Sequence, residues 1–425
     1  MINKDTIKKI LFEFWDNPLP VIYPRDLTVP LAPKKVVIVW GPRRSGKSFY
    51  FYSLAKLLFE KGIPKNQVIY FNFEDDRLSV FKKEDFQDFL DSYFELFPEN
   101  KGQKLYFFLD EIQNIDGWES FARRLHEKEK ISVFITGSSS KLLSREIATA
   151  MRGRGLSFAI YPLTFGEFLR FKGETVVKNF LYTDRRLSLP KYLEEYLTWG
   201  RFPEVVLEKD PTLKKKVLQE YFQALLYQDL AERYSLKNTL FLEEFLKYNI
   251  TNINGLFSLN SYFKLVSQNI AVSRDSVYNY SEKIGESSYL SYLPFFSYSL
   301  KTQRVNPKKI SLLDNGLRKV AATQFSHDLG KLAENAAGRF FLEQEDNKTF
   351  YWQGKHEVDF VTQNSGKLRA INLCFGEEIA EREINGLLEF KKNFPKVSEL
   401  LLLTKGQRKT IGKINLVPLG EYLLQ

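Results

Sequence analysis

The residues best suited to chemistry lie in one stretch, Gly41-Pro42-Arg43-Arg44-Ser45-Gly46-Lys47-Ser48, which directly follows the apolar run 36–40. In this G-x-x-x-x-G-K-S pattern the glycines allow tight turns, so that consecutive backbone N–H groups can surround phosphate oxygens. We expect Lys47 to reach the β- and γ-phosphates and the Ser48 hydroxyl to bind Mg²⁺. Residues 49–60, beginning at Phe49, have a helical pattern, and a helix N-terminus favours phosphate. The stretch predicts a nucleoside triphosphate site.

Two carboxylates, Asp110 and Glu111, end the apolar run 105–109. We expect this run to be a strand neighbouring the one before the phosphate loop, with Asp110 holding Mg²⁺. Glu111 would orient and polarise the attacking water, which predicts hydrolysis rather than binding alone. The alternative is a buried strand that ends in a solvated acidic turn. No N-K-x-D guanine-reading motif follows, which favours ATP over GTP.

Two further features could complete an ATPase site. The run 134–139 would bring small polar side chains, including Ser138, beside the γ-phosphate, although an ordinary serine-rich loop is equally compatible. Arg152 and Arg154 lie on a glycine-flanked turn. One of them, with Arg154 slightly favoured, could act as an arginine finger in a neighbouring subunit, which predicts a homo-oligomer. The alternative is a pair of solvated arginines.

The elements around these residues predict an α/β fold. Strand-like runs at 36–40, 68–73, 105–109, 132–136 and 158–162 alternate with helical stretches, which indicates a parallel sheet covered on both faces. We expect residues 1–165 to form the ATPase core, 166–240 a helical lid, 241–325 a winged-helix domain and 326–425 a final α/β domain. Two points stay open: whether residues 19–26 edge the adenine pocket, and whether Glu74 joins the site or packs beside Arg77.

Composition sets limits on the class of protein. A chain of 425 residues has room for two or three domains, and its net charge of +10 is compatible with a polyanionic partner. A single cysteine, Cys374, excludes an internal disulfide, and three scattered histidines exclude a His/Cys zinc site. No apolar run approaches the roughly 18 residues of a membrane span, and no signal-peptide pattern opens the sequence. We expect a cytoplasmic protein without membrane contact.

Several landmarks together resemble a known family. The chain is similar to archaeal and bacterial AAA+-type ATPases that carry a C-terminal domain of unknown function. This resemblance implies an AAA+ core that uses ATP and Mg²⁺, then a winged helix, then a domain related to restriction-type nucleases of the PD-(D/E)xK class. Beyond the two motifs above, the landmarks are Phe73-Glu74-Asp75-Asp76-Arg77-Leu78, Ile112-Gln113 with Trp118, Thr136-Gly137-Ser138-Ser139, Gly153-Arg154, Tyr161-Pro162-Leu163-Thr164-Phe165 with Glu167-Phe168, and Gly200-Arg201-Phe202-Pro203-Glu204.

The winged helix can also be argued from the residues. Residues 259–266 have the spacing of one helical face, and Ser273 is a candidate N-cap for a second helix over 274–284. On that helix Arg274, Asn279 and Lys283 would face outward, as on a DNA recognition helix. Near the expected wing, Lys301, Arg304, Lys308 and Lys309 could meet phosphates of double-stranded DNA. Winged helices also dock proteins, and that alternative carries equal weight.

The final domain departs from the nuclease pattern. Glu334 and Asp359 are present, but the element that should supply an acid and a lysine two residues apart contains Asn372 and Cys374. An amide is a poor ligand for a hard cation, and a thiol cannot replace an ammonium group. We therefore expect a nuclease-like fold without cleavage.

Three functions compete on these grounds. The leading one is an AAA+-type ATPase that couples ATP hydrolysis to DNA through its winged helix. The second is an ATP-dependent signalling switch that engages a protein partner. The third, an active ATP-dependent nuclease, is disfavoured by Asn372 and Cys374.

Overall fold

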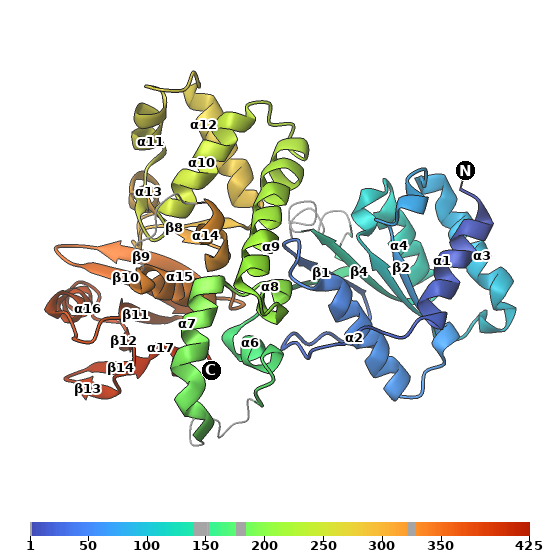
Figure 1. The fold of residues 1–425 in the computed structure, drawn as a ribbon, viewed down its shortest axis with the longest axis horizontal. Coiled ribbons are helices and arrows are strands. Elements are labelled where there is room, and N and C mark those ends of the chain that lie inside the picture. Colours follow the sequence, from blue (N-terminus) through green and yellow to red (C-terminus); the bar gives the residue numbers. More distant parts are fainter. Residues whose placement is uncertain (1, 139–150, 152, 176–183, 322–327) are drawn as a thin grey trace. The chain divides into compact units, whose positions relative to one another are not determined.

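The computed structural model describes residues 2–138, 151, 153–175, 184–321 and 328–425. It divides the chain into two compact units, Met1–Pro162 and Leu163–Gln425 (Figure 1). Unit 1 contains the phosphate-loop sequence, and unit 2 contains the helical region and the C-terminal sheet.

Unit 1 is built on a five-stranded sheet in the order β2-β3-β4-β1-β5, in which every neighbouring pair is parallel. The expected parallel α/β sheet is thus confirmed. The expectation that the strand before Asp110 neighbours β1 is wrong, because β4 lies between β1 and β3. The fifth strand covers 155–159 rather than 158–162. The strands are β1 (Val36–Gly41), β2 (Val68–Asn72), β3 (Tyr106–Asp110), β4 (Ser132–Ser138) and β5 (Gly155–Ala159).

Both faces of this sheet are buried, which explains why its strands are continuous apolar runs. On β1, Val36 and Ile38 face the core that also holds α1, α3 and α4, whereas Val37 and Val39 face the core that holds α2. All five strands end at one edge of the sheet, where α/β folds bind ligands. The helices are α1 (Lys4–Asp16), α2 (Lys47–Glu60), α3 (Phe86–Leu96) and α4 (Trp118–Glu127).

Unit 2 begins with a mainly helical part. Thr164 caps α6 by accepting a hydrogen bond from the Glu167 N–H, and the Glu167 carboxylate accepts one from the Thr164 N–H. A π-helix over Leu225–Glu232 continues α9 toward α10. The helices are α6 (Phe165–Phe171), α7 (Leu189–Trp199), α8 (Pro203–Leu207), α9 (Pro211–Ala224), α10 (Thr239–Thr251), α11 (Leu259–Val266), α12 (Arg274–Glu286), α13 (Leu300–Val305) and α14 (Arg318–Ala321).

A small antiparallel sheet in the order β6-β8-β7 follows α10. Its strands are β6 (Leu256–Phe257), β7 (Leu290–Leu293) and β8 (Lys308–Leu312), and α10, α11 and α12 gather beside it (Figure 1). Ser273 caps α12 by accepting a hydrogen bond from the Ser276 N–H, as the sequence predicts. Residues 294–307 join β7 to β8 and include α13.

The C-terminal part of unit 2 is a six-stranded mixed sheet in the order β13-β14-β12-β11-β10-β9. Helix α15 packs on one face and α16 on the other. The register of β10 against β9 shifts between Val358 and Val361, so Asp359 lies in a bulge. The elements are α15 (Leu329–Leu342), β9 (Lys348–Gln353), β10 (Glu357–Asn364), β11 (Lys367–Cys374), α16 (Glu381–Asn393), β12 (Glu399–Thr404), β13 (Lys409–Ile411), β14 (Ile414–Pro418) and α17 (Leu419–Tyr422).

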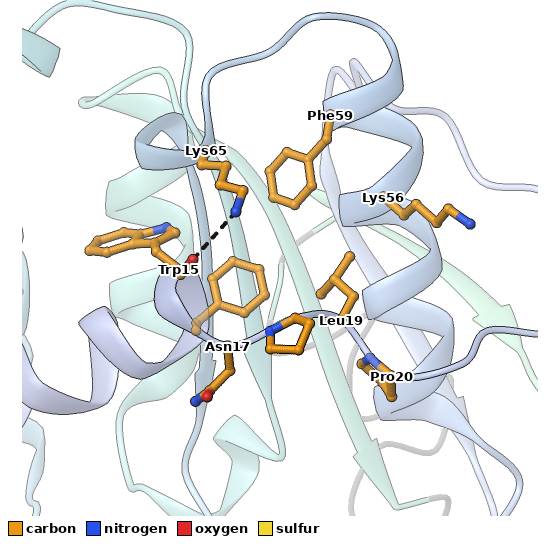
Figure 2. A pocket seen from close by; sticks show the side chains of 9 residues that line it. Trp15, Asn17, Leu19, Pro20, Lys56, Phe59 and Lys65 are labelled. Carbon is orange, nitrogen blue, oxygen red and sulfur yellow. Dashed lines mark hydrogen bonds between the residues drawn. The ribbon is translucent and has the colours of Figure 1, made fainter.

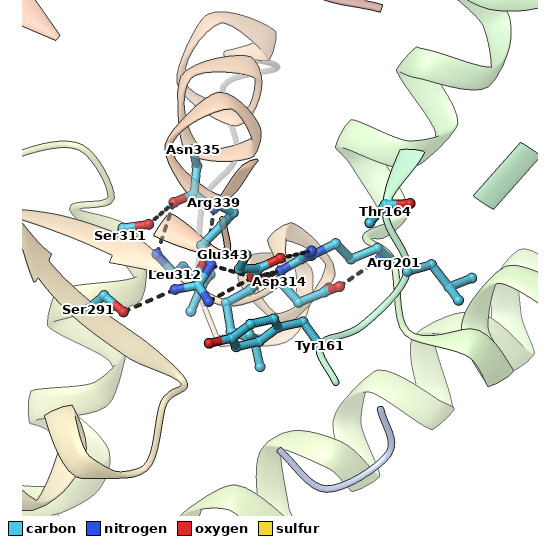
Figure 3. A network of polar contacts seen from close by, with 12 residues as sticks. Tyr161, Thr164, Arg201, Ser291, Ser311, Leu312, Asp314, Asn335, Arg339 and Glu343 are labelled. Carbon is cyan, nitrogen blue, oxygen red and sulfur yellow. Dashed lines mark hydrogen bonds and ion pairs between the residues drawn. The ribbon is translucent and has the colours of Figure 1, made fainter. Parts of the chain in front are cut away.

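A buried polar network joins the helical part of unit 2 to α15 (Figure 3). The Arg201 guanidinium donates to Glu343, the C-cap residue of α15, and to the Leu313 carbonyl oxygen. The Arg201 backbone N–H donates to Asp314 at 2.6 Å. Arg339 donates to the same Glu343 and to Ser291. Burial raises the pKa of Asp314 to about 6, although the hydrogen bond from Arg201 opposes this shift. The Gly200-Arg201 landmark therefore has a structural role in this unit.

Candidate functional site

The phosphate-loop sequence forms a tight turn between β1 and α2. Gly46 has a φ of 93° and Arg44 a φ of 64°, both in the left-handed region. A Cβ on Gly41 would lie 2.0 Å from the Ile160 carbonyl oxygen, so this position has room only for glycine. The Ser45 hydroxyl is buried without a hydrogen-bond partner among the described residues. This curled backbone and an unpartnered buried hydroxyl suit a loop that receives an oxygen-rich ligand.

Lys47, on the first turn of α2, is buried at the carboxyl-end edge of the sheet. Its Nζ lies 3.3 Å from the carbonyl oxygens of Gly41 and Pro42, and 3.2 Å from Glu111 Oε1. The ammonium group therefore already points into the turn of the loop. In this position the ammonium group forms an ion pair with Glu111, the carboxylate to which the sequence analysis assigns a catalytic role.

Glu111 directly follows β3 with a φ of 51°, an uncommon conformation for a residue other than glycine. Burial acts to raise the pKa of its carboxyl, but Lys47 and the side-chain amide of Gln113 outweigh burial and hold the pKa below its usual value. Gln113 donates to Glu111 Oε2. Glu111 is thus an ionised carboxylate, as a group that orients water must be.

Asp110, the last residue of β3, is fully buried among hydroxyl groups. Its Oδ1 accepts a hydrogen bond from Thr136 on β4, and its Oδ2 accepts one from the Tyr70 hydroxyl at 2.6 Å. Burial and the neighbouring Glu111 raise the pKa of Asp110, whereas hydrogen bonds from Ser48, Thr136 and Tyr70 act to lower it. The structure therefore brings Ser48 and Asp110, the two expected Mg²⁺ ligands, into contact.

Glu74 also belongs to this site. Its Oε1 lies 3.8 Å from a guanidinium nitrogen of Arg43 in the loop. Burial, followed by the charge of Glu111, raises the pKa of Glu74. Arg77 is engaged elsewhere, with Asp75 and Glu13. Of the two possibilities that the sequence left open, the structure shows the first: Glu74 faces the phosphate loop.

Arg25 supports the loop from outside. Its two terminal nitrogens donate to the carbonyl oxygens of Ser45, at 2.8 Å, and Tyr161, at 2.6 Å. Arg25 lies near one end of the segment 19–26, which the sequence proposes as an edge of the adenine pocket. Leu19, at the other end of this segment, lines a separate cavity of about 290 Å³ with Phe14, Phe59 and Lys56 (Figure 2). Lys56 is nine residues beyond Lys47 on α2, about 13 Å along the helix, so this cavity is distant from the phosphate loop.

Of three other expected residues of the site, one lies at the phosphate-loop edge, one at the opposite edge of the sheet and one outside the described residues. Ser138 ends β4 beside Gly41, at the phosphate-loop edge. Arg154 lies at the opposite edge, where its carbonyl oxygen accepts a hydrogen bond from the Val36 N–H and its guanidinium pairs with Glu127. The six residues of β1, about 20 Å, separate the two edges, so Arg154 cannot reach the loop of its own chain. Arg152 lies outside the described residues.

In unit 2, the four residues assigned to a degenerate nuclease site lie near one another on α15, β10 and β11. Asn372 is fully buried; its Oδ1 accepts from the Asp359 N–H, and its Nδ2 donates to Glu357 and Glu383. The Cys374 thiol donates to the Glu378 carbonyl oxygen at 3.3 Å. The side chains of Asn372 and Cys374 therefore bind protein groups.

Lys309 lies at the centre of this acidic cluster, which corrects the expectation that it lies on a surface facing phosphates. Its Nζ is 2.5 Å from Glu334, 2.8 Å from Glu357 and 3.1 Å from Asp359, and its side chain is only 2% exposed. Burial acts to lower the pKa of Lys309, but the three carboxylates outweigh it and hold the pKa well above its usual value. Burial raises the pKa of Glu334. Within the described residues, no group of three or more His, Cys, Asp or Glu side chains is arranged to hold a metal ion.

The expected DNA-contacting residues differ in their surroundings. Arg274 is exposed but donates to Asn260 Oδ1 and lies over the Tyr278 ring. Lys283 lies 3.1 Å from both Glu286 oxygens. Asn279 and Arg304 are exposed, and Arg304 lies on α13, in the connection between β7 and β8.

The amino-acid sequence matches those of known protein families. Residues 33–169 match the family described as AAA domain, and residues 190–328 and 329–422 match two domains of unknown function, DUF8612 and DUF4143. The "Uncharacterized protein MJ1544" of Methanocaldococcus jannaschii is 36% identical over 392 residues, which cover 89% of this chain and 85% of that protein. The chain belongs to the same family as this archaeal protein. An "Uncharacterized protein" of Haemophilus influenzae is 29% identical over 400 residues, covering 92% and 94% of the two chains.

Solved structures give weaker likenesses. The Orc1 protein of Aeropyrum pernix in complex with DNA has a TM-score of 0.29 and 12% identity, covering 75% of this chain and 90% of Orc1. The Hsp104–ADP complex of S. cerevisiae has a TM-score of 0.29 and 13% identity, covering 68% of this chain and only 38% of Hsp104. Likenesses of this size do not bear on what this chain binds.

These matches confirm the coarser part of the family expectation. The chain contains an AAA domain, followed by two domains whose families are described as of unknown function. No helix in the described parts of the chain is long and apolar enough to cross a membrane.

Sequence reasoning missed Arg25 and Tyr70, and it assigned Lys309 to a phosphate-facing surface rather than to the acidic cluster. Arg25 stands in a proline-punctuated segment with no motif around it. Tyr70 lies in the middle of a strand, where an aromatic residue normally indicates packing. In the sequence, Thr136 is only one member of a polar run. In the structure its hydroxyl donates a hydrogen bond to Asp110 and accepts one from the Glu111 N–H.

Proposed function

We propose that this protein binds ATP with Mg²⁺ at the phosphate loop and hydrolyses it. The observation that carries the proposal is the convergence of Lys47, Asp110 and Glu111 beside a loop whose Ser45 hydroxyl is buried and has no hydrogen-bond partner in the described part of the chain. The residues fit the ligand: the loop supplies backbone N–H groups and an ammonium for phosphates, and Ser48 with Asp110 supplies oxygens for a hard cation. When bound, Mg²⁺ would neutralise charge on the phosphates.

The contacts of Lys47 suggest how its site changes when nucleotide binds. Lys47 now rests on two backbone carbonyl oxygens and on Glu111. A phosphate carries more charge than these partners, so Lys47 would turn to it and weaken its hold on Glu111. Glu111, still oriented by Gln113, would then be available to accept a hydrogen bond from water.

Arg154, or Arg152, completes the site only from a neighbouring subunit. The distance between Arg154 and the loop of the same chain supports a role in trans, because a ring that places one subunit's Arg154 edge against the next subunit's loop edge would join them. The Glu127–Arg154 pair is exposed and so costs little to break. Arg154→Ala should lower turnover while leaving nucleotide affinity unchanged. Equal turnover in the variant would exclude Arg154 as the finger.

We further propose that unit 2 associates with double-stranded DNA and does not cleave it. The helices α10–α12 with the sheet β6-β8-β7 suit a winged helix, and the mixed sheet with Glu334 and Asp359 suits a nuclease-like domain. Lys309 fills the space between those acids, which supports the absence of cleavage. Incubation of DNA with protein and Mg²⁺ or Mn²⁺ tests this; nicking that disappears in Asp359→Ala would refute it.

A second candidate is an ATP-dependent switch that binds a protein partner. The observation that favours it is the charge of α12, which carries three carboxylates and two cations. Such a face suits a protein surface better than phosphates.

Nucleotide titration tests the central proposal. Lys47→Ala should abolish measurable ATP binding, whereas Glu111→Gln should retain ATP without turning it over. Lys56→Ala is the matched control, because Lys56 lies on the same helix with its side chain 56% exposed. Tight ATP binding by Lys47→Ala would show that the nucleotide lies elsewhere.

A further inference from the structure

The connection between β7 and β8, taken together with the first residue of β8, is a cationic surface segment near the expected DNA-binding region. Residues 294–308 contain Lys301, Arg304 and Lys308 and no acidic residue. All three side chains are exposed, and no carboxylate among the described residues pairs with them. We call residues 294–308 the basic connection.

The same segment exposes apolar side chains to an unusual degree. Tyr298 is 71%, Leu300 67% and Val305 72% exposed. Single exposed apolar residues are common on proteins, but three within eight residues indicate a contact surface.

Helix α13 brings the two kinds of side chain together. Leu300 and Arg304 are four residues apart, as are Lys301 and Val305, so these four lie on neighbouring positions of the helix surface. Thr302 and Gln303, on the other side, are half-buried, and Gln303 donates to the Ser297 carbonyl oxygen at 2.6 Å. The outward face of α13 is therefore mixed apolar and cationic.

The basic connection is held in place at both ends. Phe296 is buried among Phe350, Phe390 and Phe394, and its N–H donates to the Tyr351 carbonyl oxygen at 2.7 Å. At the other end, the Tyr351 hydroxyl donates to the Pro307 carbonyl oxygen at 2.5 Å. A surface fixed in this way loses little conformational freedom when it binds.

Helix α12 offers a weaker surface for DNA. Its carboxylates, Asp275, Glu282 and Glu286, outnumber its two cations. Lys283 is already paired with Glu286, and Arg274 with Asn260. A phosphate would have to displace these partners and approach the remaining acids.

We propose that the basic connection, rather than α12, is the principal duplex-DNA contact of this protein, an inference that rests on the proposed DNA association. Lys301, Arg304 and Lys308 contact phosphates. The outward face of α13 lies against the major groove, which is wide enough to admit a helix, and Leu300 and Val305 meet apolar base edges such as thymine methyl groups. Charge complementarity favours DNA, because the basic connection combines exposed apolar side chains with three cations and no carboxylate, and DNA is a polyanion whose grooves have apolar edges.

The salt dependence of binding tests this assignment. We would measure the affinity of the full chain for a mixed-sequence duplex by fluorescence anisotropy between 50 and 200 mM salt. Three phosphate contacts predict about a 40-fold loss of affinity over this range, since each contact contributes about −0.9 to the slope of log affinity against log salt. Lys301→Gln/Arg304→Gln should reduce that loss to about 3- to 4-fold. Leu300→Ser/Val305→Ser should weaken binding at an unchanged slope.

The control is the matched pair Arg274→Gln/Lys283→Gln on α12, which should leave the slope unchanged. All of these side chains except Lys283, which is half-buried, are exposed, and circular dichroism would verify folding. If the slope of log affinity against log salt becomes shallower in Arg274→Gln/Lys283→Gln but not in Lys301→Gln/Arg304→Gln, this inference is overturned while DNA association stands. No binding of duplex by the wild type would refute DNA association itself. If the wild type binds anionic vesicles or polyglutamate but not DNA, and Lys301→Gln/Arg304→Gln loses that binding, the surface belongs to a membrane contact or an acidic protein contact instead.

Discussion

Lys309→Met removes one positive charge from the centre of three carboxylates. Met has a similar length and no charge, so the substitution tests the ammonium group rather than the volume it fills. Glu334, Glu357 and Asp359, all within 3.1 Å of Nζ, would face one another without a counter-charge. Removing one partner from a buried ion pair costs about 3–5 kcal/mol. Glu357 adds least, because its side chain is 41% exposed and water screens it.

The loss should also depend on pH. In the wild type the raised pKa of Lys309 keeps its ammonium group charged throughout pH 5.5 to 8, whereas the raised pKa of Glu334 already makes wild-type stability fall over this range. In the variant the unpaired carboxylates hold protons more tightly when folded than when unfolded. Stability of the variant therefore falls as pH rises, and the difference from wild type should be larger at pH 8 than at pH 5.5.

Denaturant unfolding at these two pH values measures the effect. Hydrogen exchange of peptides from β8, β10 and α15 would report on unit 2 separately, because a chain of two units need not unfold in one step. Lys308→Met is the matched control, since Lys308 is exposed on the same strand and should change stability by less than about 0.5 kcal/mol. A Lys309→Met variant no less stable than Lys308→Met would refute the reasoning.

Three further predictions follow from contacts that the sequence did not reveal. Arg25→Ala should weaken ATP affinity about tenfold in a titration, because the carbonyl oxygen of Ser45 in the loop and that of Tyr161 after β5 lose a charged donor worth about 1.5–3 kcal/mol. Unchanged affinity would show that the loop does not need this support. Thr136→Val should slow turnover at least about tenfold with little change in ATP affinity, because Asp110 loses a donor; weakened binding with normal turnover would contradict this. Burial gives Asp314 a folded pKa of about 6, above its value in the unfolded chain, so the free energy of unfolding should fall by about 3 kcal/mol as pH rises from about 4 to 6. Asp314→Asn should remove this fall. An unchanged dependence of stability on pH would contradict the shift.

The phosphate loop could be located from the sequence because its features are local. A buried strand, two glycines and a following helix all lie within twenty-five residues, and each has its own signal. Asp110 and Glu111 were located for the same reason, at the end of a continuous apolar run.

The order of the strands could not be predicted in the same way. That β4 lies between β1 and β3 depends on how helices cross over the sheet, which involves contacts between distant residues. As a consequence, the roles of Thr136 and Tyr70 beside Asp110 became visible only in the structure.

Lys308 and Lys309 show a second limit. Adjacent residues of a strand point to opposite faces, so one of these lysines had to face inward. The sequence does not say which, because a shift of one residue in register exchanges the two faces. The acids that receive Lys309 come from α15 and β10, twenty-five or more positions later.

The central claim, that Lys47, Asp110 and Glu111 form a hydrolytic ATP site, is tested most directly by steady-state ATP turnover. We would compare wild type with Glu111→Gln at saturating ATP and Mg²⁺, after matching their ATP affinities by titration. We expect wild-type turnover to be measurable and the variant to bind ATP as tightly while turning it over at least about 100-fold more slowly. Equal turnover by the two proteins would contradict the claim.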